Sequence, residues 1–310
     1  MNKKRFTILL LCTILFILSG CASEQKEGES NTGTLTITDD LGRDIVITET
    51  ARIGVASGSL AECWLLAGGQ PAAVTQDVLD ERDFDLSSEV INLGALNAPS
   101  METILDADLE LLILVSSLPP HLKMEDSLEA SGVNAAYFNV ENFDDYLHLL
   151  ELFTTITGRT DLYEKHGLAI ADDVKQTLSS SKQTDSPSVL LLRASSRGIE
   201  VRNSETMVGQ MLQELGCINI ADPENFSLDE LSLEAVKTAN PDYIFIVCMG
   251  EEDEAKAQLD YQMASNPVWQ DLSAVKNSRC IYLEKELFHY KPNARWGESY
   301  EALGSILSAD

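Results

Sequence analysis

The sequence is poor in the residues from which most metal and redox sites are built. Its 310 residues include only four histidines, and no two of them are spaced as a ligand pair. The six cysteines contain no Cys-x-x-Cys motif. A local zinc site or a thioredoxin-like motif is therefore unsupported. We expect no metal site and no resident cofactor.

Basic residues are also scarce. The chain has 22 Lys and Arg against 50 Asp and Glu, a formal net charge of −28. Nucleic-acid binding depends on neutralising phosphates with cations, so we expect no nucleic-acid partner. No G-x-S-x-G, H-E-x-x-H or P-loop motif occurs. Pairs of carboxylates arise by chance in so acidic a chain and therefore do not indicate a glycosidase. An enzyme is disfavoured because these motifs are missing, and a secreted lipoprotein enzyme or an adhesin stays as an alternative.

Long apolar runs are missing, and one short run stands near the N-terminus. Phe6–Leu18 is apolar apart from two threonines, follows basic residues at positions 3–5 and precedes Ser19-Gly20-Cys21. It is shorter than the roughly 20 residues that span a bilayer. The pattern indicates a secretory signal over residues 1–20. It resembles the lipobox of bacterial lipoproteins, which implies that lipid on Cys21 holds the protein on the extracytoplasmic face of the cell membrane. An ordinary cleaved signal is the alternative.

The segment after Cys21 differs from the rest of the chain. Ala22–Gly33 contains no large apolar residue, so it cannot bury enough surface to become ordered. We interpret residues 21–33 as a flexible linker. Four cysteines remain beyond it: Cys63, Cys217, Cys248 and Cys280. The last three lie in or beside apolar runs, which favours buried thiols, and one disulfide is the alternative.

Strands and helices are predicted to alternate in the first half. Thr34–Thr38 and Asp44–Thr48 alternate apolar and polar residues, which predicts an antiparallel hairpin. Arg52–Ala56 and Leu111–Val115 are short apolar runs typical of buried parallel strands. Helices are predicted at 60–67 and 101–107, and a strand at 135–138 ends this half. Residues 34–142 are therefore predicted to form an α/β lobe.

A long helical pattern separates this lobe from a second one. It covers 143–182 with a break at Gly158. Strands at 189–192, 243–247 and 280–283 then alternate with helices at 207–215, 232–239 and 295–307. We predict an α/β fold of two Rossmann-like lobes, 34–142 and 187–310. A single long α-helix within 143–186 joins them, and the ligand cleft lies between them.

Four segments carry a resemblance to a known family. Asp39-Asp40-Leu41-Gly42-Arg43 is similar to its D-x-x-G-R start, and Pro99–Ile113, Leu231–Phe245 and Asn266–Lys276 match later landmarks. The chain resembles the iron-complex and vitamin B12 substrate-binding proteins of ABC importers, of the class III, helical-backbone type. One departure is Ala107-Asp108, where the family usually has Pro-Asp.

The resemblance implies a function and partners. The chain would capture a ferric siderophore or haem and deliver it to an ABC permease and its ATPase, acting as a monomer. A corrinoid is the alternative ligand. Glu102 and Glu234 each begin a predicted helix, where the helix dipole favours a carboxylate. Helix capping alone explains such residues; the resemblance implies that both dock onto arginines of the permease.

Candidate ligand contacts follow from the rule that ligands bind beyond the carboxyl ends of parallel strands. Cations gather in the loops predicted at 193–197 and 288–296, which favours an anionic ligand, although pairing with nearby acids is the alternative. His121 and His289 are expected in loops beside the cleft. Among the cations, Arg202 and Arg295 have the strongest expectation of a structural role, and Trp64 and Trp269 are expected in the core. The predicted ligand-binding residues are Ser57, Gly58, Ser59, Ser116, Arg193, Arg197, Met249, Phe288, Tyr290, Lys291 and Arg295.

Overall fold

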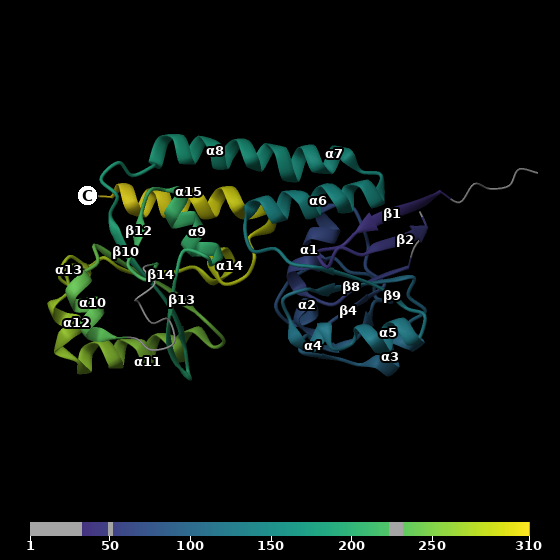
Figure 1. The fold of residues 1–310 in the computed structure, drawn as a ribbon, viewed down its shortest axis with the longest axis horizontal. Helices are drawn as coiled ribbons and strands as arrows, with labels where there is room; N and C mark the ends of the chain where they lie inside the picture. Colours follow the sequence, from purple (N-terminus) through teal and green to yellow (C-terminus); the bar gives the residue numbers. More distant parts are fainter. Residues whose placement is uncertain (1–32, 49–51, 223–231, 310) are drawn as a thin grey trace, which may run out of the picture. The chain divides into compact units, whose positions relative to one another are not determined.

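The computed structural model describes residues 33–48, 52–222 and 232–309 (Figure 1). The predicted signal peptide, Cys21 and all but the last residue of the predicted linker lie outside this range. Thr34–Asp310 forms one compact unit. Within the described residues, no helix has the length and apolar character that crossing a membrane requires.

The predicted N-terminal hairpin is confirmed, and its turn is fixed by one buried carboxylate. Strands β1 (Thr34–Thr38) and β2 (Asp44–Thr48) pair antiparallel, with Thr34 opposite Thr48. Asp39 accepts hydrogen bonds from the Arg43 amide and guanidinium and from the Tyr137 amide. These contacts hold the pKa of the Asp39 carboxyl below its usual value, although burial opposes the effect. The D-x-x-G-R segment therefore ties the hairpin to the first sheet.

The first sheet is parallel, with strand order β5-β4-β3-β8-β9. All five residues of β8 are buried, which explains its continuous apolar run. The strands are β3 (Ile53–Val55), β4 (Ala73–Val74), β5 (Ile91–Asn92), β8 (Leu111–Val115) and β9 (Asn134–Phe138). The helices are α1 (Gly58–Leu66), α2 (Gln76–Asp80), α3 (Met101–Asp106), α4 (Pro119–Leu122) and α5 (Glu125–Ala130). The short strands β6 (Gly94–Ala95) and β7 (Ala98–Pro99) pair separately.

The helical connection consists of α6 (Phe143–Thr157) and a longer helix that follows the predicted break. Helix α6 begins with a capping box and is followed by Gly158. The φ of Gly158 is 69°, a left-handed backbone conformation that favours glycine and ends the helix. A second continuous helix runs from α7 (Thr160–Tyr163) through a π-helical turn, η1 (Glu164–Leu168), to α8 (Ala169–Ser181). The predicted break at Gly158 is thus confirmed, and the predicted long helix corresponds to the continuous helix Thr160–Ser181, which leads to the second lobe.

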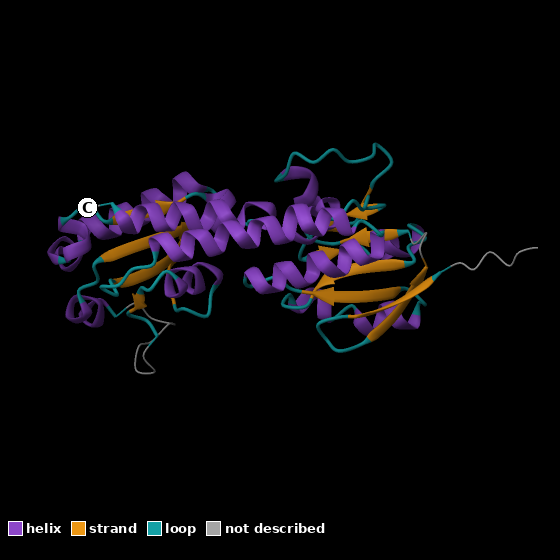
Figure 2. Ribbon diagram, turned by 90° about the horizontal axis from the view of Figure 1, so that it is seen from above, coloured by secondary structure: helices purple, strands orange, loops and turns teal. Residues whose placement is uncertain are grey.

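The second sheet has the order β11-β10-β13-β14, with β12 also beside β10. Its strands are β10 (Ser188–Ser195), β11 (Gly198–Arg202), β12 (Ile218–Asn219), β13 (Tyr243–Cys248) and β14 (Cys280–Leu283). Successive residues of β10 enter different apolar clusters: Val189 and Leu191 one, Leu190 and Leu192 the other. The sheet is therefore buried on both faces, and Figure 2 shows helices on both sides of it.

Two predictions in this lobe were wrong or incomplete. The predicted loop 193–197 is wrong, because β10 continues to Ser195 and turns into the antiparallel strand β11. Helix α11 (Glu252–Ser265) was not predicted, since only a narrow stripe of its residues is buried. The remaining helices are α9 (Met207–Glu214), α10 (Leu233–Ala239), α12 (Pro267–Asp271), α13 (Ser273–Lys276), α14 (Lys285–Phe288), the 3-10 turn η2 (Asn293–Arg295) and α15 (Trp296–Ser308).

The cysteines are free thiols throughout the described part of the chain. Cys63, Cys217 and Cys248 are buried and Cys280 is half-buried. Burial raises the pKa of the Cys217 thiol to about 12 and that of the Cys280 thiol to about 11. These protonated thiols pack as small apolar side chains.

The two lobes repeat one structural unit. Equal numbers of residues separate Ser100 from Ser232 and Glu110 from Asp242. Each serine hydroxyl accepts an amide hydrogen bond at the start of a helix, α3 or α10. Each acid accepts hydrogen bonds from the amide and hydroxyl of one residue, Thr48 for Glu110 and Ser188 for Asp242. The helix–strand unit, with its capping and its anchor, therefore occurs twice.

Candidate ligand-binding site

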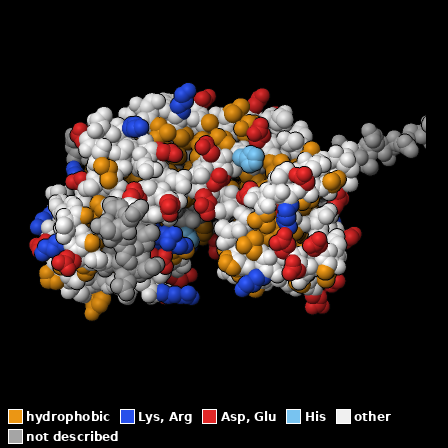
Figure 3. All heavy atoms as spheres, in the orientation of Figure 1, with side chains coloured by type: hydrophobic (Ala, Val, Ile, Leu, Met, Phe, Trp, Pro, Cys, Tyr) orange, Lys and Arg blue, Asp and Glu red, His pale blue; other side chains and the backbone are white. Residues whose placement is uncertain are grey.

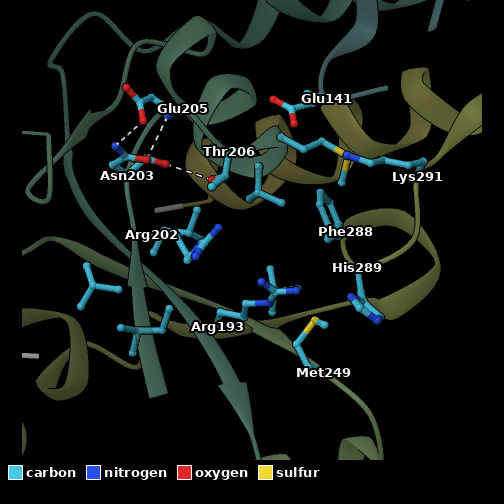
Figure 4. Close-up of a pocket in the computed structure, with 16 residues that line it drawn as sticks. Glu141, Arg193, Arg202, Asn203, Glu205, Thr206, Met249, Phe288, His289 and Lys291 are labelled. Carbon is cyan, nitrogen blue, oxygen red and sulfur yellow. Dashed lines mark hydrogen bonds between the residues drawn. The ribbon is translucent and has the colours of Figure 1, made fainter. Parts of the chain in front are cut away.

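A cavity of about 470 Å³ lies against strands β10, β11 and β13 (Figure 4). Strands β10, β11 and β13, the start of α9 and the segment after α14 form most of its wall, and Glu141 completes it from the segment before α6. The lining residues are Glu141, Leu191, Leu192, Arg193, Val201, Arg202, Asn203, Glu205, Thr206, Met207, Val208, Val247, Met249, Phe288, His289 and Lys291.

Cations in this cavity are only partly neutralised. Arg193 and Arg202 share one carboxylate: Glu200 Oε2 lies 3.9 Å from Arg193 Nη1 and 3.4 Å from Arg202 Nη1. Burial lowers the pKa of the Arg193 guanidinium, and the neighbouring Arg202 lowers it further. Among the described residues, Glu200 is the one carboxylate within ion-pair distance of either guanidinium, so both can also bind an external anion.

Lys291 is a third cation of the cavity. Burial lowers the pKa of its ammonium, and Glu141 and Asp145 act in the opposite direction. No carboxylate of the described residues lies within ion-pair distance of it. An ammonium that is withdrawn from water without a close partner favours the binding of an anion.

His289 adds a neutral donor or acceptor. Burial lowers the pKa of its imidazole to about 4, and Lys285 and Arg193 contribute in the same direction. The ring is therefore neutral near pH 7. Met249 lines the same cavity, and Figure 4 shows both side chains on the same side of it.

A smaller cavity of about 290 Å³ lies beside β9 and α6. Its wall carries three carboxylates and no Lys or Arg, whereas the larger cavity carries three cations and two carboxylates. It is lined by Asp40, Ser116, Phe138, Asn139, Glu141, Asp145, His148 and Leu149. Burial raises the pKa of the Asp40 carboxyl, whose Oδ2 accepts a hydrogen bond from the Asn139 amide at 2.7 Å. Glu141 lines both cavities.

The predicted ligand contacts are divided between the cavities and other places. Arg193, Met249, Phe288 and Lys291 line the larger cavity, and Ser116 lines the smaller one.

Six other predicted contacts lie elsewhere. The Gly58 amide donates to Asp77 Oδ2 at 2.7 Å, and the Ser59 carbonyl accepts from Asn293 Nδ2 at 3.1 Å. The Tyr290 ring lies 5.1 Å from each of two cations, Arg82 and Lys285. The remaining three are Ser57, which precedes α1, Arg197, exposed at the β10–β11 turn, and Arg295, paired with Glu298 at 2.9 Å.

Several cavity residues were missed from the sequence. Arg202, expected to be structural, lines the cavity, as do Asn203, Thr206 and Glu141. The alternation of Ile199 and Val201 was the available signal for β11, and recognising that strand would have placed Arg202 beside Arg193.

His121 was expected in a loop beside the cleft, but it lies in helix α4 and is fully buried. Its Nδ1 accepts the Val115 amide at 2.9 Å, and its Nε2 lies 2.7 Å from the Leu96 carbonyl. Both ring nitrogens are thus used within the first lobe. Trp64 and Trp269 are buried in the core, as expected. Among the described residues, no group of three or more His, Cys, Asp and Glu side chains could hold a metal ion.

Glu102 and Glu234 are exposed in the first turns of α3 and α10. The two helices occupy equivalent places in the repeated unit. On the face in Figure 3, acidic side chains are widely spread and basic ones are few.

Comparisons with known proteins agree with this architecture. The sequence profile of a family described as periplasmic binding protein matches residues 53–287. YhfQ of Bacillus subtilis, provisionally named an ABC transporter substrate-binding lipoprotein, is 23% identical over 92% of each chain. The Fe(3+)-citrate-binding protein YfmC of the same species is 23% identical, covering 92% of this chain and 90% of YfmC. The petrobactin-binding protein YclQ of Bacillus subtilis superposes with a TM-score of 0.72 at 15% identity, covering 90% of this chain and 100% of YclQ.

Proposed function

This chain belongs to the periplasmic binding protein family, and we propose that it captures an anionic ferric chelate and delivers it to an ABC permease. It is a substrate-binding protein and not an enzyme. The observation that carries the proposal is the group Arg193, Arg202 and Lys291 in one cavity of a chain with a net charge of −28. A cavity in which the few cations of an acidic chain are concentrated favours the binding of an anionic ligand.

The chemistry of these cations suits the oxygen donors of an iron chelate. A guanidinium presents a planar set of donors that matches carboxylate or catecholate oxygens, and such charge-assisted hydrogen bonds are stronger than neutral ones. The apolar residues Phe288, Val247 and Leu191 supply contact area for the organic body of the ligand. The relative YfmC is named for ferric citrate, an anionic carboxylate chelate.

Haem is the second candidate ligand. The neutral imidazole of His289 and the thioether of Met249 line the same cavity, and both groups serve as axial ligands of haem iron in proteins. The propionates of haem would use the same cations. A corrinoid has no comparable observation in its favour.

The proposal extends to the anchor and the docking face. Lipid on Cys21, after removal of residues 1–20, would hold the protein at the outer face of the membrane, and residues 21–33 would leave it free to reorient. Glu102 and Glu234, exposed at equivalent helix starts, would contact the permease. The proposed lobe boundaries remain 34–142 and 187–310, with 143–186 between them.

Isothermal titration calorimetry of the chain from residue 22 onward tests the ligand class. The panel is ferric citrate, a ferric catecholate, haemin and cyanocobalamin, with iron-free citrate as the control. We expect binding of at least one anionic iron complex and none of iron-free citrate. Tight binding of cyanocobalamin alone, or no binding to any member, would contradict the proposal.

A further inference from the structure

Glu141 is an acid held at the edge of a basic cavity. It lies between β9 and α6 and lines both cavities. Its Oε1 accepts a hydrogen bond from Asn139 Nδ2 at 2.7 Å, and its amide donates to Asp145 Oδ2 at 2.9 Å. Asn139 is itself fixed, because its Oδ1 accepts the Ser117 hydroxyl at 3.0 Å. Glu141 is exposed, and these hydrogen bonds position both its backbone and its side chain at the edge of the cavity.

The carboxylate of Glu141 acts on Lys291. Burial lowers the pKa of the Lys291 ammonium, whereas the negative charges of Glu141 and, to a smaller extent, Asp145 raise it. Figure 4 shows Glu141 and Lys291 at the same end of the cavity. An anion bound at Lys291 must therefore share that cation with Glu141 and lie close to a like charge.

The two cavities differ in charge. Arg193, Arg202 and Lys291 line the larger cavity together with Glu141 and Glu205, whereas the smaller one carries Asp40, Glu141 and Asp145 and no Lys or Arg. A chelate whose negative charge is confined to one side can face the cations and turn its uncharged side toward Glu141. A chelate with negative charge on all sides places a like charge beside Glu141 in every orientation.

From this arrangement we propose that Glu141 is a specificity-determining residue, which limits the negative charge of the chelate that the site accepts. The inference rests on the proposed function, and it names the ligand class more closely as iron chelates of low or one-sided negative charge. Asn139 is a positioning residue, because it acts only by orienting the Glu141 carboxylate.

Two probes that differ in charge test the inference. Ferric citrate is anionic, whereas ferrichrome is an uncharged ferric trihydroxamate. In calorimetry at low ionic strength, where charges are weakly screened, we expect Glu141→Gln to tighten ferric citrate about threefold to tenfold. The affinity for ferrichrome, whether strong or weak, should stay the same. The ratio of the two affinities is the readout, and 0.5 M salt should reduce the change.

Asp144→Asn is the matched control. Asp144 lies in the first turn of α6, is exposed and lines neither described cavity. The variant removes the same charge from a neighbouring position and should leave the affinities for ferric citrate and ferrichrome unchanged. Asn139→Ala removes the positioning bond without changing the charge, and we expect it to shift the ratio in the same direction as Glu141→Gln, by less.

The outcomes separate the inference from the proposed function. If wild type binds ferric citrate and Glu141→Gln leaves the ratio unchanged, or Asp144→Asn changes it equally, the inference is wrong and the proposed function stands. If wild type binds no ferric chelate at all, both are overturned.

Discussion

At the residue scale, burial and charge decide what the cavity can hold. Lys291 and Arg193 are half-buried, and burial is the first cause of the lowered pKa of each. His289 is affected more strongly, and its imidazole pKa falls to about 4. The cavity therefore combines charged cations with a neutral imidazole at neutral pH.

The shifted pKa of His289 predicts a pH dependence of stability. The folded-state value of about 4 lies below the ordinary value of 6.5, so between these values the unfolded chain binds more protons. The free energy of unfolding should accordingly fall as the pH drops from about 6.5 toward 4. Urea unfolding at pH 7 and pH 5 measures this loss.

The variant His289→Gln isolates the contribution of this residue. It should lose less stability than wild type between the two pH values, because a glutamine does not titrate. His148→Gln, at an exposed position, should behave as wild type does. Equal losses in wild type and His289→Gln would show that the imidazole is not buried in the folded protein.

At the element scale, hydrogen bonds to the backbone fix irregular helices. The π-helical turn η1 lies within the continuous helix Thr160–Ser181, and the buried Tyr146 of α6 donates its hydroxyl to the His166 carbonyl at 2.8 Å. A π-helical turn leaves a carbonyl outside the regular α-helical pattern. Tyr146 therefore joins α6 to the second helix at this turn.

Removing this hydroxyl should destabilise the helical pair. Tyr146→Phe leaves the ring in place and deprives the His166 carbonyl of its donor, so we expect a loss of about 1–2 kcal/mol in the free energy of unfolding. Tyr163→Phe is the control, since the Tyr163 ring packs against Gly167 on the same turn. Urea denaturation measures both, and equal small losses would contradict the role given to Tyr146.

Elements with strong periodicity were predictable from the sequence, and those defined by tertiary contacts were not. Leu111–Val115 and Cys280–Leu283 were predicted with their observed bounds. Helix α11 was missed because Ala255, Leu259 and Met263 are its only buried residues in an acidic stretch. Strand β11 was missed because residues 193–197 were interpreted as a loop and the residues after them were not recognised as a strand. The side-chain direction of Arg202 depends on that strand, so the sequence did not place Arg202 in the cavity with Arg193.

At the scale of the whole molecule, the last segment of the chain contacts the first lobe. Asn293, fully buried with a φ of 49°, donates to the Ser59 carbonyl and to Glu62 at 2.8 Å. The Phe143 and Trp296 rings lie 5.6 Å apart. Several predicted ligand contacts, Ser59 and Tyr290 among them, lie in or beside this junction. The sequence did not reveal this junction, because Asn293 and Ser59 are 234 residues apart in the chain.

The equivalent helix starts predict a docking function. Replacing Glu102 and Glu234 together by lysine should abolish uptake of a bound iron chelate while leaving its affinity unchanged, since both side chains are exposed and lie outside the two described cavities. Uptake of radioactive iron by cells measures the first, and calorimetry the second.

A control for total charge accompanies this test. The pair Glu164→Lys and Glu254→Lys changes the charge equally at other exposed positions and should preserve uptake. Normal uptake by the Glu102→Lys, Glu234→Lys variant would exclude the docking role.

The central claim is that three cations hold an anionic ferric chelate, and calorimetry with ferric citrate tests it most directly. Replacing Arg193, Arg202 and Lys291 together by glutamine should weaken binding by about a hundredfold or more, because each charge-assisted hydrogen bond contributes more than about 1 kcal/mol. The control replaces Arg159, Lys165 and Lys175, all exposed, and should bind as wild type does. Unchanged affinity in the cavity variant, or equal weakening in the control, would contradict the account.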